Sequence, residues 1–344
     1  MSMRMKSLLL ASAMTAAMLG ISQDVSAEAA ATLTLYVDNS VGDDISVINV
    51  AQQKVIATVK VGERPHAVCP TEDGRIVYTT TEREFALKAI DTATNTVVNT
   101  WPLPADPNEC AVTKDGHYVV VPLRGNNTAV ILDTTTNQFV KTLPIRGPHN
   151  CATPFGGSND FVFCEEQRSW TMAKIDMKTM EIVDKLNVNG EARPFIVTPD
   201  MKTMYVALSD LGGVAIIDVP NKMVEQVVLP KTKLMGDCAL EPSNTPTHGI
   251  GLTPDMKKLW ITDVAGAAVY VLDLQTKKLS QPIAVGKCPN WFAISNDGKY
   301  VAVSNTGSDS VSIIDGKSYK VLSEIPVGKG PKRIDMAYVP ARNS

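Results

Sequence analysis

Three of the four histidines of this chain stand in similar short sequence contexts. His66 lies in RPHAVC, His149 in GPHNC and His248 in TPTHGIG, so each follows a proline within two residues. Imidazole can bind a transition metal or transfer a proton near neutral pH. The shared context indicates equivalent positions of an internal repeat, which would bring residues far apart in sequence to one site.

A repeat of about 42 residues runs along the chain. Short apolar segments end in Asp or Asn at regular intervals, at Asn49, Asp91, Asp133, Asp176, Asp218, Asp273 and Asp315. These intervals are 42 or 43 residues, with one of 55. The surrounding segments are short, β-branched and bounded by Gly, Pro, Asn and Asp, a pattern typical of strands and turns. Four strands in each of seven units predict an all-β, seven-bladed β-propeller.

The two ends of the repeat array complete one unit. The first repeat starts at LTLYVDN (33–39) without an inner strand, and PKRIDMAYVP (331–340) supplies one extra inner strand. We therefore expect these terminal strands to pair and close the ring, giving four antiparallel strands in every blade. Residues 28–344 would form a single domain.

Residues 1–27 have the features of a secretory signal peptide. Arg4 and Lys6 precede an apolar run from Leu8 to Ile21, and VSA at 25–27 fits a cleavage site. No later stretch is apolar for long enough to cross a bilayer. We expect an exported protein, periplasmic in a Gram-negative host, without a membrane span.

Composition limits the partners and the cross-links. The net charge is −3 and no basic block occurs, so nucleic-acid binding is not expected. Six cysteines in an exported chain allow up to three disulfides. Cys238 with Cys288 is the best candidate pair. Cys110 and Cys151 occupy the same position of adjacent repeats and are a second candidate pair, although connectivity cannot be read from sequence.

The segment YVAVSNTGSDSVSIIDGKSYKVLSEIPVGKGPKRIDMA (300–337) closely resembles the YVTN-type β-propeller repeat, and the resemblance covers nearly all of the chain after residue 27. Within that group the pattern is most similar to exported propellers encoded beside quinoprotein (PQQ-dependent) alcohol-oxidation systems. The group also includes lyases and surface or scaffold proteins. The resemblance implies the fold, and it suggests a periplasmic dehydrogenase or cytochrome as a partner.

Aligning the repeats on the turn after each inner strand defines a ring position, seven residues before the Asp of that turn. The ring position holds His66, Asn108, His149, Arg193, His248, Asn290 and Lys332. The next position holds Ala67, Glu109, Asn150, Pro194, Gly249, Trp291 and Arg333. Inner strands begin beside the central channel of a propeller, so we expect both sets at one channel mouth.

Three interpretations of this mouth stay open. The three histidines could bind Zn, Cu or Fe, with Glu109 as a fourth ligand or general base. Alternatively, the mouth could bind an anion or small polar molecule through its basic and amide side chains, namely Arg64, Asn108, Arg146, Asn150, Arg193, Asn290, Lys332 and Arg333. In the third interpretation, these polar groups only solvate the pore. Trp291 would stack on a planar substrate, close the pore or pack at the rim.

The leading hypothesis is a metal-dependent lyase, hydrolase or oxidase acting on a small polar or anionic molecule. Its rival is a non-catalytic binding or scaffold protein, accessory to a quinoprotein dehydrogenase. The extra residues of the long repeat, within 229–249, are interpreted as a lid over the mouth. Outer-rim candidates come from the loops between second and third strands, namely Arg83, Arg124, Arg168 and Trp170. His117 is expected on the opposite face.

Overall fold

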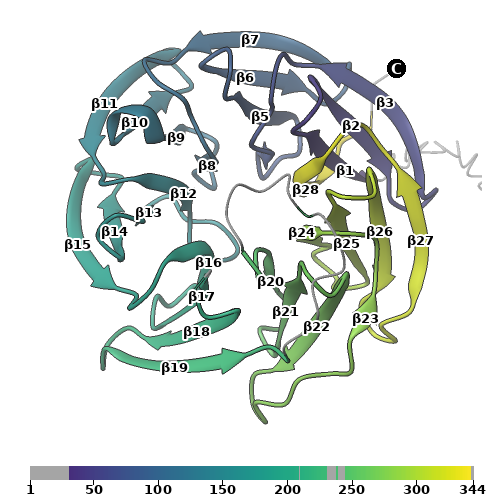
Figure 1. Cartoon of the computed structure of the whole chain (residues 1–344). Helices are drawn as coiled ribbons and strands as arrows, with labels where there is room; N and C mark the ends of the chain where they lie inside the picture. Colours follow the sequence, from purple (N-terminus) through teal and green to yellow (C-terminus); the bar gives the residue numbers. More distant parts are fainter. Residues whose placement is uncertain (1–30, 209, 231–237, 239–244, 342–344) are drawn as a thin grey trace, which may run out of the picture.

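The computed structural model describes residues 31–208, 210–230, 238 and 245–341. The signal peptide predicted for residues 1–27 lies outside these residues, and so does most of the predicted lid. In the described part of the chain, 28 strands form seven four-stranded antiparallel sheets arranged as a ring around a central channel (Figure 1). The predicted seven-bladed β-propeller is confirmed.

Each sheet is one blade, and its strands run in order from the channel to the rim. Blade 1 contains β28 (Pro331–Val339), β1 (Thr32–Asn39), β2 (Asp44–Asn49) and β3 (Lys54–Lys60). Blade 2 contains β4 (Cys69–Pro70), β5 (Ile76–Thr81), β6 (Ala86–Asp91) and β7 (Thr96–Pro102). Blade 3 contains β8 (Ala111–Val112), β9 (Tyr118–Leu123), β10 (Thr128–Asp133) and β11 (Gln138–Pro144), with the short 3-10 helix η1 (Arg124–Asn126) between β9 and β10.

The remaining four blades repeat this order. Blade 4 contains β12 (Pro148–Ala152), β13 (Phe161–Glu166), β14 (Thr171–Asp176) and β15 (Glu181–Asn187). Blade 5 contains β16 (Ala192–Val197), β17 (Thr203–Leu208), β18 (Gly213–Asp218) and β19 (Met223–Val228). Blade 6 contains β20 (Ile250–Leu252), β21 (Lys258–Asp263), β22 (Ala268–Asp273) and β23 (Ile283–Ala284). Blade 7 contains β24 (Pro289–Ile294), β25 (Tyr300–Asn305), β26 (Ser310–Asp315) and β27 (Val321–Pro326).

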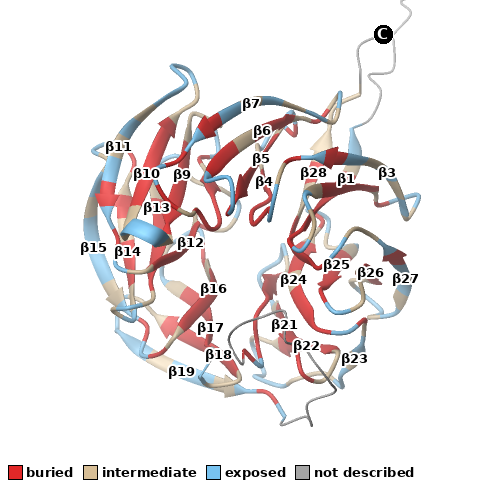
Figure 2. Cartoon of the chain, turned by 45° about the horizontal axis from the view of Figure 1, so that its top comes forward, coloured by how far each residue is buried: buried red, intermediate tan, exposed pale blue. Residues whose placement is uncertain are grey.

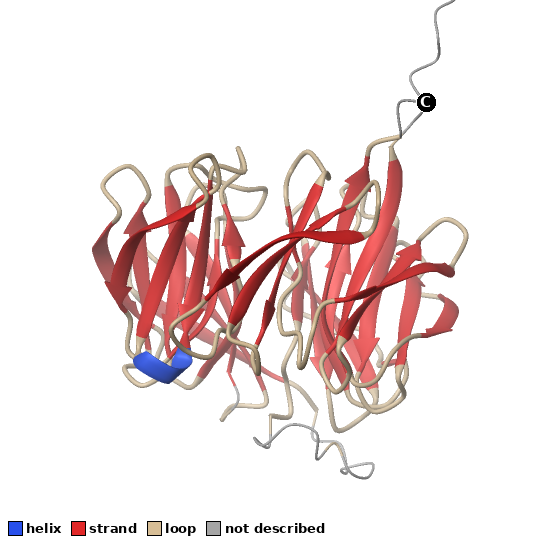
Figure 3. Ribbon diagram, turned by 90° about the horizontal axis from the view of Figure 1, so that it is seen from above, coloured by secondary structure: helices blue, strands red, loops and turns tan. Residues whose placement is uncertain are grey.

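The ring is closed by pairing of the two terminal strands, as predicted. β28 is antiparallel to β1, with Ile334 opposite Val37 and Tyr338 opposite Leu33. In Figure 1 the yellow β28 lies inside the purple β1. The side view in Figure 3 shows that β28 ends on one face of the ring and η1 lies on the other. The face with η1 carries the channel mouth, because inner strands begin there.

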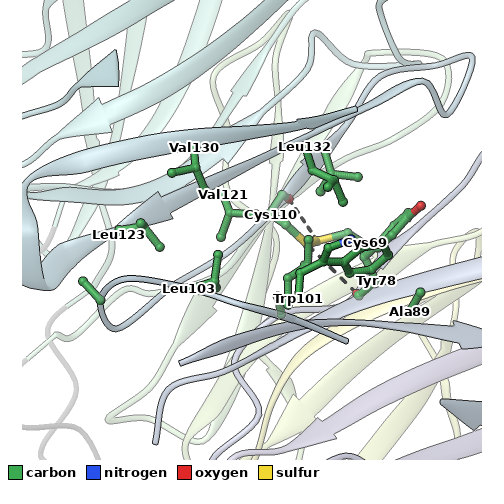
Figure 4. Packing of buried hydrophobic residues seen from close by; sticks show 14 residues of the cluster. Cys69, Tyr78, Ala89, Trp101, Leu103, Cys110, Val121, Leu123, Val130 and Leu132 are labelled. Atoms are coloured by element: carbon green, nitrogen blue, oxygen red, sulfur yellow. Dashed lines mark hydrogen bonds between the residues drawn. A yellow bond between two sulfur atoms is a disulfide. The ribbon is translucent and has the colours of Figure 1, made fainter. Parts of the chain in front are cut away.

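The hydrophobic core is divided among the interfaces between neighbouring blades. Each of the seven clusters of buried apolar residues draws on two adjacent blades. In Figure 2 the inner and middle strands are mainly buried and the outermost strands largely exposed. The cluster between blades 2 and 3 contains Tyr78, Trp101, Cys110 and Leu132 (Figure 4). Because each blade packs on two others, opening one interface leaves two apolar faces in water.

The repeated Asp after each third strand stabilises the following turn, as expected. Oδ1 of Asp91 accepts the backbone N–H of Thr94 at 2.8 Å, and Oδ1 of Asp273 accepts that of Thr276 at 2.7 Å. The turn then needs a left-handed residue, and Asn95 has φ 54°. In each turn the Asp side chain thus accepts the backbone N–H of a residue three positions later, which is a hydrogen bond typical of Asp in turns.

The three disulfides agree only partly with the predicted pairing. Cys238 bonds to Cys288, as predicted. The pairing of Cys110 with Cys151 was wrong. Cys110 bonds instead to Cys69 on the inner strand of blade 2, and Cys151 bonds to Cys164 within blade 4. Cys164 lies directly opposite Cys151 on the adjacent strand, so the shorter connection was available within one sheet.

Removing the disulfide between blades is expected to cost more stability than removing the one within a blade. The bond between Cys69 and Cys110 spans 41 residues, and that between Cys151 and Cys164 spans 13. From the loss of loop entropy, removal of the first disulfide is expected to lower the free energy of unfolding by about 4 kcal/mol, and removal of the second by about 3 kcal/mol. Urea unfolding of the C69A/C110A and C151A/C164A variants measures both losses. A larger loss in C151A/C164A would contradict the expectation.

Within the described residues, no helix has the length and apolar character needed to cross a membrane.

Candidate functional site

The ring residues lie where the inner strand of a blade stops pairing with its neighbour. In β12, Pro148 pairs with Glu166 and pairing resumes at Cys151 with Cys164. His149 and Asn150 therefore oppose a single residue of β13, which is the arrangement of a β-bulge. The same irregularity occurs between Ala192 and Phe195 in β16 and between Pro289 and Phe292 in β24. Bulges bend a strand and redirect its side chains.

Side chains of the second strand accept the backbone N–H groups that each bulge releases. Oδ1 of Asp38 accepts from Lys332 at 3.0 Å and from Arg333 at 2.8 Å. Oγ1 of Thr262 accepts from His248 at 3.1 Å and from Gly249 at 2.8 Å. Ser304 and Glu165 do the same for Trp291 and Asn150. Buried backbone donors need such partners, which explains polar residues in otherwise apolar strands.

Arg333 extends from blade 1 to three other blades. Its Nε lies 2.8 Å from Oε2 of Glu109 in blade 3, as an ion pair rather than an aligned hydrogen bond. Its Nη2 donates to Oδ1 of Asn150 in blade 4 at 3.2 Å, and more weakly to Oδ1 of Asn108 at 3.5 Å. Its guanidinium carbon lies 3.8 Å from the ring centre of Trp291 in blade 7. A side chain that touches blades 3, 4 and 7 lies across the channel axis.

Arg333 is thus the centre of a layer that crosses the channel, and its side chain is only 1% exposed. Small residues leave the space that it fills, because the equivalent positions of three other blades hold Ala67, Pro194 and Gly249. At position 249 a Cβ atom would lie 2.4 Å from the carbonyl oxygen of Asn290, so close packing of blades 6 and 7 requires glycine. We call Arg333, Glu109, Asn108, Asn150 and Trp291 the arginine layer.

The imidazole ring of His149 lies between the carboxyl group of Glu165 and the guanidinium group of Arg193. Its Nδ1 lies 3.2 Å from Oε2 of Glu165, and its Nε2 lies 3.4 Å from Nη1 of Arg193. A guanidinium group can only donate, so Nε2 is the acceptor and Nδ1 carries the proton. The imidazole is therefore neutral and protonated at Nδ1. Its Nε2 could bind a metal only if the hydrogen bond from Arg193 were broken.

The other two histidines, His66 and His248, each contact a different neighbouring residue rather than one common point in the channel. Nδ1 of His66 lies 3.5 Å from Oε1 of Glu82, a carboxylate that also binds Arg64 at 2.8 Å and Arg124 at 2.5 Å. Nδ1 of His248 lies 3.3 Å from the carbonyl oxygen of Asn290. The His248 ring is tilted against Trp291, with ring centres 5.8 Å apart.

The predicted three-histidine metal site does not fit this arrangement. Among the described residues, no group of three or more His, Cys, Asp or Glu side chains is placed to hold a metal ion. His66, His149 and His248 line the same mouth, but guanidinium groups stand among them. Glu109, proposed as a fourth ligand or base, is the ion-pair partner of Arg333. We derive no step through a metal.

Burial changes the charge of the mouth. It lowers the pKa of His66 and His149 well below 6.5, and the nearby cations lower both further. Burial also raises the pKa of Glu109 and Glu165 to about 8, although Arg333 opposes the shift at Glu109. Near neutral pH the histidines are therefore uncharged and the carboxyl groups are partly protonated. The permanent positive charge of the guanidinium groups remains.

Among the residues that the structure describes, two donors of the arginine layer have neither a hydrogen-bond partner nor an ion-pair partner. They are Nη1 of Arg333 and Nδ2 of Asn108, and both are buried. An unmet buried donor costs about 1–3 kcal/mol, and more when it is charged. The layer therefore presents two donors from neighbouring side chains and lacks a matching acceptor.

The pH dependence of stability is expected to depend on Glu165. Its pKa is raised from 4.5 to about 8 in the folded chain, so the folded state holds an extra proton between these values. Stability then falls as pH rises toward 8, by up to about 1.4 kcal/mol per pH unit. His66 and His149 bind protons near pH 6.5 only in the unfolded chain, and this contribution is the same in the parent and in a variant at Glu165.

The Glu165→Gln variant is expected to have a flatter pH profile of unfolding free energy between pH 6.5 and 8. Urea unfolding at several pH values measures the slope. The exposed Glu72→Gln variant is the matched control and should keep the parent slope. An unchanged slope in Glu165→Gln would show that this carboxyl group is ionised throughout.

The remaining predicted residues are not members of the arginine layer. Arg64 is partly exposed and bound to Glu82, and Arg146 is exposed. Lys332 and Asn290 are buried at the mouth. Trp170, predicted at the outer rim, is 56% exposed. The sequence analysis did not identify Glu82, Glu165 or Asp38 as residues of the mouth. Each is an acidic residue in or directly after an otherwise apolar strand, and this pattern could have indicated a buried polar contact.

Comparisons with known proteins support the fold. No family model matches the chain. Antigen Lp49 of Leptospira interrogans serogroup Icterohaemorrhagiae serovar copenhageni is 29% identical over 148 residues, which cover 43% of this chain. The match spans 31%, about a third, of the length of that curated relative.

Two solved structures have the same architecture. Hydrazine synthase of Kuenenia stuttgartiensis is 20% identical with a TM-score of 0.70, covering 82% of this chain and 92% of that one. Dihydro-heme d1 dehydrogenase NirN in complex with DHE is 16% identical with a TM-score of 0.64, covering 88% of this chain and 74% of that one. At these identities the likeness establishes the seven-bladed β-propeller fold alone.

Proposed function

We propose that this protein binds a small anionic molecule with a carboxylate group at the mouth of its central channel. The observation that carries the proposal is the arginine layer, in which Nη1 of Arg333 and Nδ2 of Asn108 are buried donors without an acceptor in the described part of the chain. A carboxylate offers two acceptor oxygens with a negative charge, and guanidinium groups bind it strongly. Such a ligand would satisfy both donors at once.

The charge of the mouth supports an anion rather than a cation. Arg193, Lys332 and Arg333 are all buried there, Arg193 also pairs with Glu191 at 3.2 Å, and Nη1 of Arg333 stays unpaired among the described residues. Burial raises the pKa of Asp38 to about 7 and of Glu109 to about 8, which reduces the negative charge that these carboxyl groups carry near neutral pH. Charges in a concave, poorly solvated site act more strongly than on an open surface.

Trp291 orients the guanidinium group. Arg333 stacks on its ring at 3.8 Å, and His248 lies against the same indole at 5.8 Å between ring centres. Cation–π stacking restricts the plane of Arg333 and directs the unpaired Nη1. The site is therefore preorganised, which reduces the entropy lost on binding.

The proposed role is that of an exported binding protein. Three disulfides are compatible with export, and the YVTN-type resemblance suggests an accessory to a periplasmic quinoprotein system. The metal-dependent lyase, hydrolase or oxidase considered from sequence is not retained, because its ligand set does not fit.

Isothermal titration with acetate, succinate and phosphate tests the proposal. The wild-type protein should bind at least one of the carboxylates at a single site. The E109Q/R333M double variant, which removes both charges of the pair, should bind it at least tenfold more weakly. A surface pair gives the matched control, K329M/D309N. Equal affinity in the two double variants, or no carboxylate binding by the wild type, would refute the proposal.

A further inference from the structure

A separate cavity lies deeper in the channel, beyond the arginine layer. Its volume is about 250 Å³, and its walls come from the inner strands of six blades. Val112 and Thr153 stand four positions after Asn108 and His149, on strands that run away from the mouth. Glu109, Asn150 and Trp291 form its upper end, so the arginine layer separates it from the mouth.

The walls of this cavity combine an apolar part with the polar side chains of Glu109, Asn150, Thr153 and Asp335. Val68, Pro70, Val112, Pro194 and Phe195 line it. A volume below the usual 300–1,000 Å³ of ligand pockets suits a small molecule with a short hydrocarbon part.

Asp335 is the polar group that distinguishes this cavity from the mouth. Its Oδ1 accepts the backbone N–H of Met336 at 2.7 Å. Within the described residues, no side chain forms a hydrogen bond or an ion pair with it. Glu109, the other carboxyl group in the lining, already has Arg333. Burial without a nearby cation raises the pKa of Asp335 to about 7.

We propose that this cavity binds a small organic cation, an alkylammonium, with its charged group on Asp335. The ammonium group would supply the positive charge that the carboxylate lacks, and the alkyl chain would pack on Val68, Val112 and Phe195. An anion is disfavoured, because both titratable groups in the lining, Glu109 and Asp335, are acids and no lining residue carries a positive charge. The two sites share Glu109, Asn150 and Trp291 as a common wall, whereas Asp335, which would hold the cation, belongs to the cavity alone.

Isothermal titration with butylammonium tests this site. The wild-type protein should bind one equivalent, and the Asp335→Asn variant should bind at least tenfold more weakly. Asp255→Asn, in an exposed turn, is the matched control and should bind like the wild type. Succinate should not displace butylammonium from the wild-type protein, which separates this site from the mouth.

A second variant and two analogues keep the test decisive. Val112→Trp fills the cavity, leaves Asp335 in place and should abolish binding even if Asp335→Asn fails to fold. Butanol and butyrate match the alkyl chain without the positive charge and should bind at least tenfold more weakly than butylammonium. No binding by the wild type, equal binding by Asp335→Asn or Val112→Trp, or a preference for butanol or butyrate would overturn the proposal.

Discussion

A chain that ends at Gly330 is expected to lose cooperative folding altogether. The deletion removes β28, exposes the whole inner edge of β1 and uncovers the apolar residues packed on Ile334 and Ala337, which are 1% and 3% exposed. Loss of these two side chains, of Arg333 and of the ring closure together costs more than about 5 kcal/mol. That is comparable to the whole stability of a typical domain, about 5–15 kcal/mol.

Circular dichroism during heating measures this effect. The control is a chain that ends at Ala341, which keeps every residue of β28 and should melt like the full-length protein. Retention of a sharp transition within a few degrees of the parent by the chain ending at Gly330 would show that the ring does not depend on its terminal strand pair.

Arg333→Met is expected to destabilise the protein by about 3–5 kcal/mol at alkaline pH, where Glu109 is ionised in the parent protein. The substitution leaves Glu109 in a buried position without its cation. The pKa of Glu109, already about 8, would rise further, so the cost should be largest at alkaline pH, where the carboxyl group cannot easily stay protonated. Adding Glu109→Gln removes the orphan charge and should restore most of the loss.

Urea unfolding of the two single variants and of E109Q/R333M gives a double-mutant cycle. A coupling free energy of about 2 kcal/mol or more is expected for a buried charged pair. Additive losses would mean that Arg333 and Glu109 act independently, and the account of the arginine layer would then be wrong.

The blade number and the ring closure could be predicted because they follow from local sequence patterns. The repeated Asp before a turn, as at Asp91 and Asp273, fixes the spacing of the strands. The surplus strand at 331–340 has an unpaired partner at 33–39 in the same sequence. Pseudo-symmetry then places equivalent residues around one channel, whatever their type.

The contacts inside the channel could not be predicted in the same way. The reach of Arg333 to blades 3, 4 and 7 depends on the channel radius and on the small residues at Ala67 and Gly249. Three histidines at one mouth suggested a metal, but each turns toward a neighbour such as Glu165 or Asn290. Partners on the second strand of a blade are not visible in an alignment of inner strands.

The same limit applies to the disulfides. Equivalent positions in adjacent repeats made Cys110 and Cys151 a reasonable pair. The bond that forms depends on which sulfur atoms face each other, and Cys164 lies opposite Cys151 across one strand pair. Sequence separation alone does not contain that information.

The most direct test of the central claim is to locate an anion in the channel. Anomalous diffraction from crystals soaked in bromide should show a peak in contact with Nη1 of Arg333, and succinate should displace it. Bromide peaks confined to the outer surface, with ordered water alone beside Arg333 in the presence of succinate, would contradict the proposal that this channel binds carboxylates.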